Sequence, residues 1–132
     1  LPHLTELILP GFEAAASPQI GDLRRLEILG FVSGPLKILP EEIGNCTDLT
    51  ELYVNFTRLE ELPARIGELI NLRKLHLWNI TFEPSNLLPP QISQLSNLRE
   101  LFICGHKTRF LPPEIGDLGN LTELTMMGTH LD

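Results

Sequence analysis

The sequence predicts an α/β solenoid, in which a curved parallel β-sheet forms the concave face and short helical or 3-10 segments form the convex face. Two observations predict it. Five segments of the chain share one pattern of isoleucine and leucine positions and align without gaps. Within each segment the apolar spacing changes from steps of three, which suit a helical turn, to steps of two, which suit a strand.

The repeat is measured from the isoleucine that each segment shares. These residues are Ile20, Ile43, Ile66, Ile92 and Ile115. The differences are 43 − 20 = 23, 66 − 43 = 23, 92 − 66 = 26 and 115 − 92 = 23, so one unit holds three extra residues, which we place within "FEPSNLL". A sixth unit, "LPHLTELIL", opens the chain without its first half. The predicted repeats lie near 1–16, 17–39, 40–62, 63–88, 89–111 and 112–132, and together form one domain, which we expect to be part of a longer protein.

Each unit is expected to contain a helical turn followed by a strand. Ile43, Cys46 and Leu49 recur at steps of three and predict the turn, while Leu49, Leu52 and Val54 predict a strand with one buried face. A proline before each turn suits its first position or the bend that enters it. These prolines are Pro40, Pro63, Pro89 and Pro112. Stacked units bury the apolar side that one unit alone cannot cover.

The strand segments carry a recognisable consensus. "LTELYVNFTRL", "LRKLHLWNITF" and "LTELTMMGTHL" follow the pattern L-x-x-L-x-L-x-x-N/C-x-L. The chain therefore resembles the leucine-rich repeat family over nearly its whole length. Its "LPxxIGxLxxLxxLxL" type is similar to the intracellular Ras-group proteins and to the irregular repeats of plant nucleotide-binding immune receptors.

One column departs from the family pattern. The family places asparagine there, where its side chain bonds the backbone of the neighbouring turn. The column here reads Phe12, Gly34, Thr57, Ile80, His106 and Thr129. Because buried backbone groups must still be paired, we expect irregular turns in which Thr57, Thr129 and His106 supply hydrogen bonds.

Composition excludes several classes of partner. The hydrophobic content of 42% and charged content of 20% are those of a soluble domain, and no apolar run reaches membrane-spanning length. A net charge of −7 argues against nucleic acid and anionic membranes as partners. Cys46 and Cys104 are too few for a disulfide framework, which favours the cytoplasm. Four N-glycosylation sequons, at Asn45, Asn55, Asn79 and Asn120, keep an extracellular location open.

Side chains between the buried strand positions are predicted to point outward in columns across the concave face. They include the single Trp and the single Tyr of the chain. Exposed aromatic groups of this size are typical of binding surfaces, and glutamates beside them favour a partner with basic residues. The predicted partner-binding residues are Tyr53, His76, Trp78, Phe102, Cys104, Met127, Glu51, Lys74, Glu100 and Glu123. Alternatively, the rings cover sheet surface beside glycines such as Gly30, and the glutamates only increase solubility.

The chain shows no pattern that predicts an enzyme, a metal site or a cofactor. Cys46 shares a column with leucines and is expected in the core. Cys104 lies near His76 and His106, but the spacing does not match a zinc site. "GHKT" lacks the glycines of a phosphate-binding loop.

The predicted function is therefore to bind a protein or peptide partner through the concave face. One alternative is a ligand-sensing or autoinhibitory region of a multidomain immune receptor or signalling protein, and another is a secreted effector. Neither end shows a polar cap, so we also expect end-to-end contact with other repeats or domains.

Overall fold

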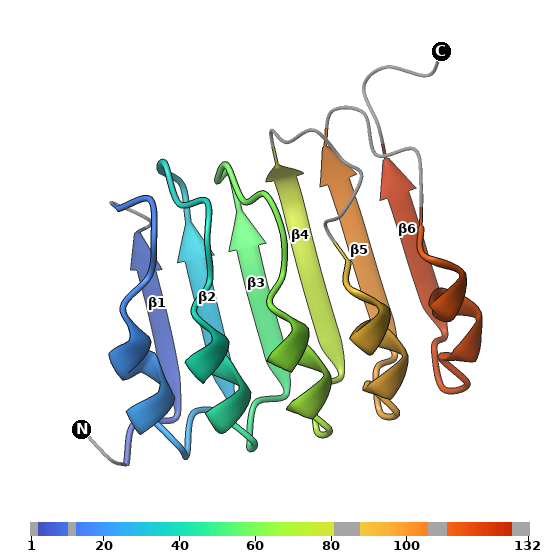
Figure 1. The fold of residues 1–132 in the computed structure, drawn as a ribbon, viewed down its shortest axis with the longest axis horizontal. Helices are drawn as coiled ribbons and strands as arrows, with labels where there is room; N and C mark the ends of the chain where they lie inside the picture. Colours follow the sequence, from blue (N-terminus) through green and yellow to red (C-terminus); the bar gives the residue numbers. More distant parts are fainter. Residues whose placement is uncertain (1–2, 11–12, 81–87, 106–110, 128–132) are drawn as a thin grey trace.

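A computed structural model describes residues 3–10, 13–80, 88–105 and 111–127 of the chain. Six parallel strands form one sheet in sequence order (Figure 1). The strands are β1 (Glu6–Pro10), β2 (Ile28–Val32), β3 (Glu51–Asn55), β4 (Lys74–Ile80), β5 (Glu100–Gly105) and β6 (Glu123–Met127). This architecture confirms the predicted solenoid.

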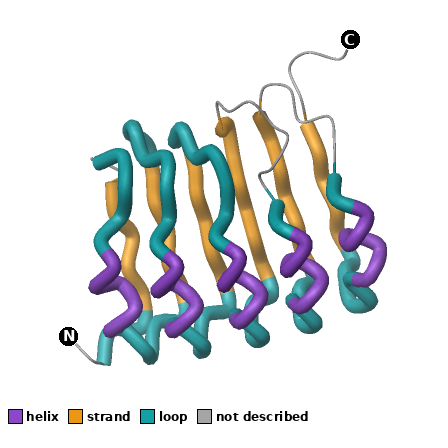
Figure 2. Tube along the Cα trace, in the orientation of Figure 1, coloured by secondary structure: helices purple, strands orange, loops and turns teal. Residues whose placement is uncertain are grey.

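Short 3-10 helices form the second layer, opposite the sheet (Figure 2). They are η1 (Pro18–Asp22), η2 (Glu41–Asn45), η3 (Ala64–Glu68), η4 (Pro90–Gln94) and η5 (Pro113–Asp117). Each repeat forms one coil of the solenoid, with a strand and, except in the first repeat, a 3-10 helix. The core lies between the layers, and its leucines and isoleucines come from every coil. Each such side chain stabilises the fold by about 1.5–3 kcal/mol relative to exposure.

The strand register places like residues side by side. Leu29 lies opposite Leu52, which lies opposite Leu75, and all three are fully buried. The backbone hydrogen bonds between neighbouring strands begin in the turn before the strand. Before β3, for example, Thr50 N and Glu51 N both donate to Glu27 O, at 2.8 and 3.1 Å. One repeat in sequence is therefore one strand in the sheet.

The step of three residues arises from 3-10 hydrogen bonding. Cys46 N donates to Ile43 O, and Leu49 N donates to Cys46 O, each at 3.0 Å. The proline of this coil, Pro40, occupies the N-cap with φ −72° and ψ 149° rather than the first helical position. Pro63, Pro89 and Pro112 do the same, so these prolines form the bend that enters the helix.

Two columns of polar residues hold the turns at the two ends of the strands. Thr57 is buried, and its Oγ1 accepts a long 3.4 Å hydrogen bond from Leu59 N, which agrees with the expected role of this threonine. Phe12, His106 and Thr129 lie outside the described residues. A second column stands directly before the last leucine of each 3-10 turn, and its three asparagines donate across coils in the turn that precedes the strand. Asn71 Nδ2 bonds Thr47 O at 2.8 Å, Asn97 Nδ2 bonds Ile70 O at 2.7 Å, and Asn120 Nδ2 bonds Ser96 O at 2.6 Å.

The turns that follow β2 and β3 are irregular, as predicted. Ser33 and Phe56 both have φ 58°, and Gly34 has φ 118°. A left-handed backbone costs a non-glycine residue about 1–2 kcal/mol. The predicted insertion within residues 82–88 lies, except for Leu88, outside the described residues.

The last strand is less buried than the strand before it. Leu124 and Met126 occupy inward positions of the repeat, yet they are 47% and 37% exposed. Their counterparts Leu101 and Ile103 on β5 are each 1% exposed. The difference arises because β6 packs against a neighbouring strand on one side only.

Candidate functional site

The sheet surface that points away from the 3-10 helices is the one on which the sequence predicts the concave binding face. We call it the outer face. Strand register divides its side chains into three rows that run across the sheet. The first row is Glu6, Ile28, Glu51, Lys74, Glu100 and Glu123. The middle row is Ile8, Gly30, Tyr53, His76, Phe102 and Thr125. The third row is Pro10, Val32, Asn55, Trp78, Cys104 and Met127.

Four rings form one continuous aromatic cluster on this face. The Tyr53 and His76 rings meet edge to face with centroids 5.1 Å apart. His76 continues to Phe102 at 5.6 Å, and Phe102 stacks on Trp78 at 4.8 Å with an interplanar angle of 15°. Offset and edge-to-face pairs at these distances stabilise each other beyond simple burial. The cluster therefore presents a prearranged surface over β3, β4 and β5.

First-row carboxylates fix the polar edge of the cluster. Glu51 Oε1 accepts a hydrogen bond from the Tyr53 hydroxyl at 3.1 Å and lies 3.5 Å from Lys74 Nζ. Glu100 Oε2 lies 3.3 Å from His76 Nε2. Burial, the hydrogen bond to Glu51 and the charges of Glu51 and Glu100 raise the pKa of Tyr53 to about 12. Tyr53 is thus a hydrogen-bond donor at neutral pH.

Third-row side chains leave apolar surface open to solvent. Val32, Trp78 and Met127 are 37%, 43% and 55% exposed. Asn55 Oδ1 is buried, and within the described residues it has no hydrogen-bond partner. Phe56 follows directly and is 55% exposed, so the apolar surface continues into the turn beyond β3.

The ten residues predicted to bind a partner all lie on the outer face. Tyr53, His76 and Phe102 are half-buried rather than open, because the rings pack on one another across strands, and Cys104 is half-buried as well. Sequence reasoning did not include Val32 and Phe56 among the binding residues. Val32 could have been found from its place in the Trp78 column, whereas the exposure of Phe56 depends on a left-handed turn.

The sequence also left open that the rings cover sheet surface beside glycines such as Gly30. In the structure, another side chain lies closest to Gly30. A Cβ placed on Gly30 would lie 2.7 Å from Ile8 Cδ1 and 3.7 Å from Tyr53 Cβ. Ile8 is therefore the closest cover over Gly30, and the Tyr53 ring packs on His76 instead.

The two cysteines differ as expected. Cys46 is fully buried, its Sγ donates to Ile20 O at 3.3 Å, and burial raises the pKa of its thiol. Cys104 is half-buried between Trp78 and Met127 in the third row. Across the described ranges, no three metal-ligating side chains gather into a group. His106 lies outside those ranges.

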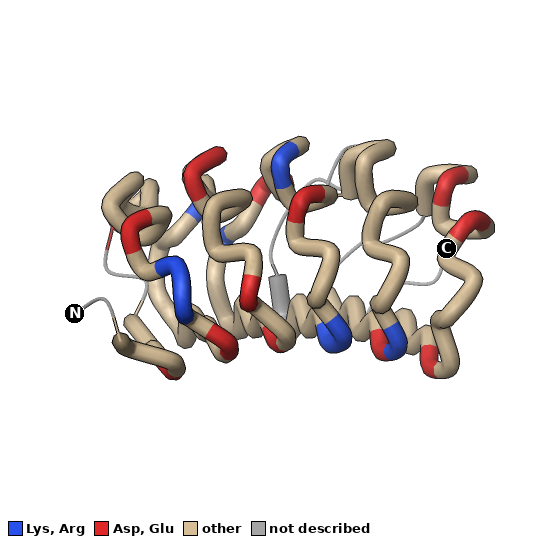
Figure 3. The backbone as a smooth tube through the Cα atoms, turned by 90° about the horizontal axis from the view of Figure 1, so that it is seen from below, with Lys and Arg blue, Asp and Glu red and all other residues tan. Residues whose placement is uncertain are grey.

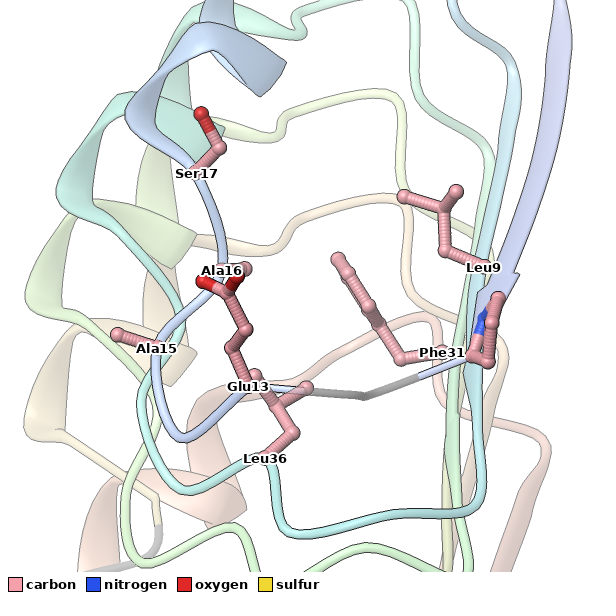
Figure 4. Close-up of a pocket in the computed structure, with 8 residues that line it drawn as sticks. Leu9, Glu13, Ala15, Ala16, Ser17, Phe31 and Leu36 are labelled. Atoms are coloured by element: carbon pink, nitrogen blue, oxygen red, sulfur yellow. The ribbon is translucent and has the colours of Figure 1, made fainter.

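A separate cavity of about 260 Å³ opens at the β1 end of the molecule (Figure 4). Leu9 and Phe31 point from the strands toward the Ala15–Ser17 segment, and Leu36 and Glu13 close one side. Glu13 stands 23 residues before Leu36, and Ala16 stands 23 residues before Leu39. The cavity therefore forms where the first coil replaces two leucine columns with glutamate and alanine.

Charged residues also lie away from the outer face. Figure 3 shows acidic residues spread over several coils along the molecule. On the 3-10 layer, Arg65 Nη2 donates to Asn45 Oδ1 at 2.7 Å and to Glu68 Oε2 at 2.8 Å, which ties η2 to η3. None of the described helices is long and apolar enough to cross a membrane.

Comparison with known proteins agrees with this architecture. A family model described as "Leucine-rich repeat region" matches residues 4–132. No curated protein sequence matches the chain.

Three solved structures illustrate the similarity. The leucine-rich repeat domain of the type III effector XopL is 28% identical with a TM-score of 0.83, and the match covers 96% of this chain and 45% of that one. A Leptospira interrogans leucine-rich repeat protein is 29% identical with a TM-score of 0.65, covering 96% and 35%. The ectodomain of the Arabidopsis thaliana membrane receptor kinase GASSHO1/SCHENGEN3, solved in complex with CASPARIAN STRIP INTEGRITY FACTOR 2, is 25% identical with a TM-score of 0.72, covering 96% and 16%. The chain thus spans less than half the length of each.

Proposed function

Because the chain belongs to the leucine-rich repeat family, we propose that it is a binding module that takes a protein or peptide partner on the outer face of its sheet. The observation that carries the proposal is the aromatic cluster of Tyr53, His76, Phe102 and Trp78. A protein or peptide partner is also consistent with the GASSHO1/SCHENGEN3 ectodomain, which was solved with a bound factor.

The cluster has the properties of a binding hot spot. Tryptophan and tyrosine are enriched among residues that dominate binding energy, especially where surrounding side chains exclude water. Trp78 is 43% exposed, while its other face stacks on Phe102, so its orientation is fixed before a partner arrives. A fixed ring loses little conformational freedom on binding.

A capture experiment tests the proposal. The chain and a Tyr53→Ala/Trp78→Ala/Phe102→Ala variant of verified fold are compared as baits in extracts of the source cell. The matched control is Ile38→Ala/Ile70→Ala, because these residues are 51% and 54% exposed but lie outside the three rows. We expect partners to be lost from the triple variant and kept by the control. Equal capture by all three baits would contradict recognition by the outer face.

A second candidate is a ligand-sensing region of a multidomain receptor or signalling protein. It is favoured by the similarity to a receptor kinase ectodomain, of which the match covers 16%. In this case, binding to the outer face alters the activity of adjoining domains. Trp78→Ala in the full-length protein is then expected to change the signalling output. If binding is lost but the output is unchanged, the result contradicts the sensing role and supports a simple binding module.

We also propose a cytoplasmic location. Cys46 and Cys104 are both free, and the Asn120 amide is held by Ser96 O at 2.6 Å, where a glycan would break the bond. Mass spectrometry of the native protein tests this, since a glycan on Asn120 would overturn it.

A further inference from the structure

We infer that the outer face takes a cationic amphipathic helix that lies across the strands. Its basic side chains meet the first row, and its apolar side chains meet the third row. This inference rests on the proposed function, because it specifies the partner for the same face.

The two rows differ in charge and polarity. The first row holds four glutamates and one lysine, so its formal charge is −4 + 1 = −3. The third row has no charged residue and exposes Val32, Trp78 and Met127. A partner that covers the face therefore needs a basic edge and an apolar edge on opposite sides of one segment.

The distance between the rows matches the width of a helix. Residues four apart on a strand, such as Glu100 and Cys104, are separated by about 13 Å. A helix with its side chains is about 10–12 Å wide, so one helix can contact both rows while its body lies over the middle row. The middle-row side chains of Tyr53, His76 and Phe102 are half-buried and form the floor over β3, β4 and β5, whereas Ile8 on β1 is 47% exposed.

The direction across the strands follows from how far the rows extend. Neighbouring strands lie about 4.8 Å apart, and one helical turn rises about 5.4 Å, so successive turns can meet successive strands. The large exposed apolar residues of the third row lie on β2, β4 and β6, with the half-buried Asn55 and Cys104 between them. A segment that followed a single strand would contact one residue of each row and would leave most of this surface open.

Local hydrogen bonds and charges define where the basic edge can lie. Tyr53 and His76 hold the carboxylates of Glu51 and Glu100 in place. In the turns just before the first row, Arg73 and Arg99 are exposed next to β4 and β5, where they repel basic side chains that extend beyond the row, while Glu27 is exposed next to β2 and attracts them. Over β4 and β5 the row itself is therefore the favourable position for cations.

Peptide selection tests the inference without knowledge of the natural partner. The probe is a phage-displayed library of random 18-residue peptides, selected on the purified chain at low salt. We expect enriched peptides with a net positive charge and apolar residues three and four apart. Synthetic copies are expected to gain helical circular dichroism when they bind.

Variants connect the selected peptides to the two rows. Trp78→Ala is expected to weaken binding about 30-fold, and Met127→Ala provides a second third-row variant if Trp78→Ala does not fold. Glu100→Gln/Glu123→Gln is expected to weaken binding about three- to tenfold at low salt and less at high salt. The matched control is Glu114→Gln/Asp117→Asn on η5, which removes the same charge from the opposite layer and is expected to leave binding unchanged.

The outcomes separate the inference from the proposed function. If the selected peptides need Trp78 for binding but are neutral or acidic, or if they bind without becoming helical, the inference is overturned and the proposed binding module still stands. An equal effect of the first-row and η5 charge variants would also overturn it. No enrichment, or peptides insensitive to both third-row variants, would overturn the inference and the proposed use of this face together.

Discussion

Replacement of Ala16 by leucine is expected to stabilise the fold, because it restores the leucine column that Leu39 and Leu62 continue. Ala16 is half-buried and lines the 260 Å³ cavity at the β1 end. Leucine adds three carbon atoms, and each buried CH₂ contributes about 0.8 kcal/mol, or about 2.4 kcal/mol for full burial. Because the cavity is open to solvent, we expect about half of this free energy, close to 1 kcal/mol. For a chain of 132 residues this corresponds to a rise in Tm of about 3–5 °C.

Thermal unfolding followed by circular dichroism measures this shift, with Ala14→Leu as the matched control. Ala14 is exposed and does not line the cavity, although its carbonyl accepts hydrogen bonds from Lys37 N and Ile38 N. The same leucine side chain there is expected to change Tm by less than about 1 °C. A rise no larger for Ala16→Leu than for Ala14→Leu, or a fall in Tm, would refute the reasoning that missing leucine volume creates the cavity.

Three further predictions concern the core, the cross-coil ladder and the outer face. Cys46→Ser is expected to destabilise the fold by about 1–2 kcal/mol in urea unfolding, because it places a hydroxyl in a leucine column, although Ile20 O remains as an acceptor. Cys104→Ser is expected to lower the free energy of unfolding much less. Equal losses for the two variants would contradict the column assignment. Asp48→Asn is expected to stabilise by about 0.5–1 kcal/mol by extending the column of Asn71 and Asn97 to one more coil, and an unchanged urea midpoint would show that the ladder cannot be extended there. The phenol of Tyr53, the single tyrosine, is expected to titrate near pH 12 in ultraviolet absorbance, above its ordinary value of 10, so its contribution to stability is complete below pH 10 and is lost as pH rises toward 12. A Tyr53 midpoint near 10, unaffected by Glu51→Gln, would contradict the hydrogen bond to Glu51.

Strand register and outer-face rows were predictable from sequence because stacking makes them depend on the alignment of the repeats. Once the shared isoleucines are aligned, Tyr53, His76 and Phe102 must lie on neighbouring strands. Half-burial of these rings was not predictable, since it depends on centroid distances and ring tilts across strands. The exposure of Leu124 agrees with the predicted order of the repeats, because within the described residues the strand of the last repeat has a neighbour on one side only.

The cross-coil asparagine bonds were also beyond sequence reasoning. The family pattern directs attention to the column of Thr57, where asparagine is absent. Asn71, Asn97 and Asn120 stand in a column that the pattern does not specify, and only their positions beside carbonyls of the preceding coil show that they donate. The sequence shows where an expected partner is missing, but geometry is needed to find which side chains pair the backbone groups of the other turns.

Phe56 shows why the surface is less predictable than the core. Its φ of 58° costs a bulky residue about 1–2 kcal/mol, and its side chain is 55% exposed, so intrinsic preference and burial both argue against phenylalanine here. The turn is nevertheless held, because Phe56 N donates to Trp78 O at 2.7 Å and joins the ends of β3 and β4. Ser33 takes the same place in the preceding coil with the same φ, and Ser33 N donates to Asn55 O at 2.7 Å. The left-handed turn is therefore a feature of the repeat, and the residue type that occupies it is what the column pattern does not specify.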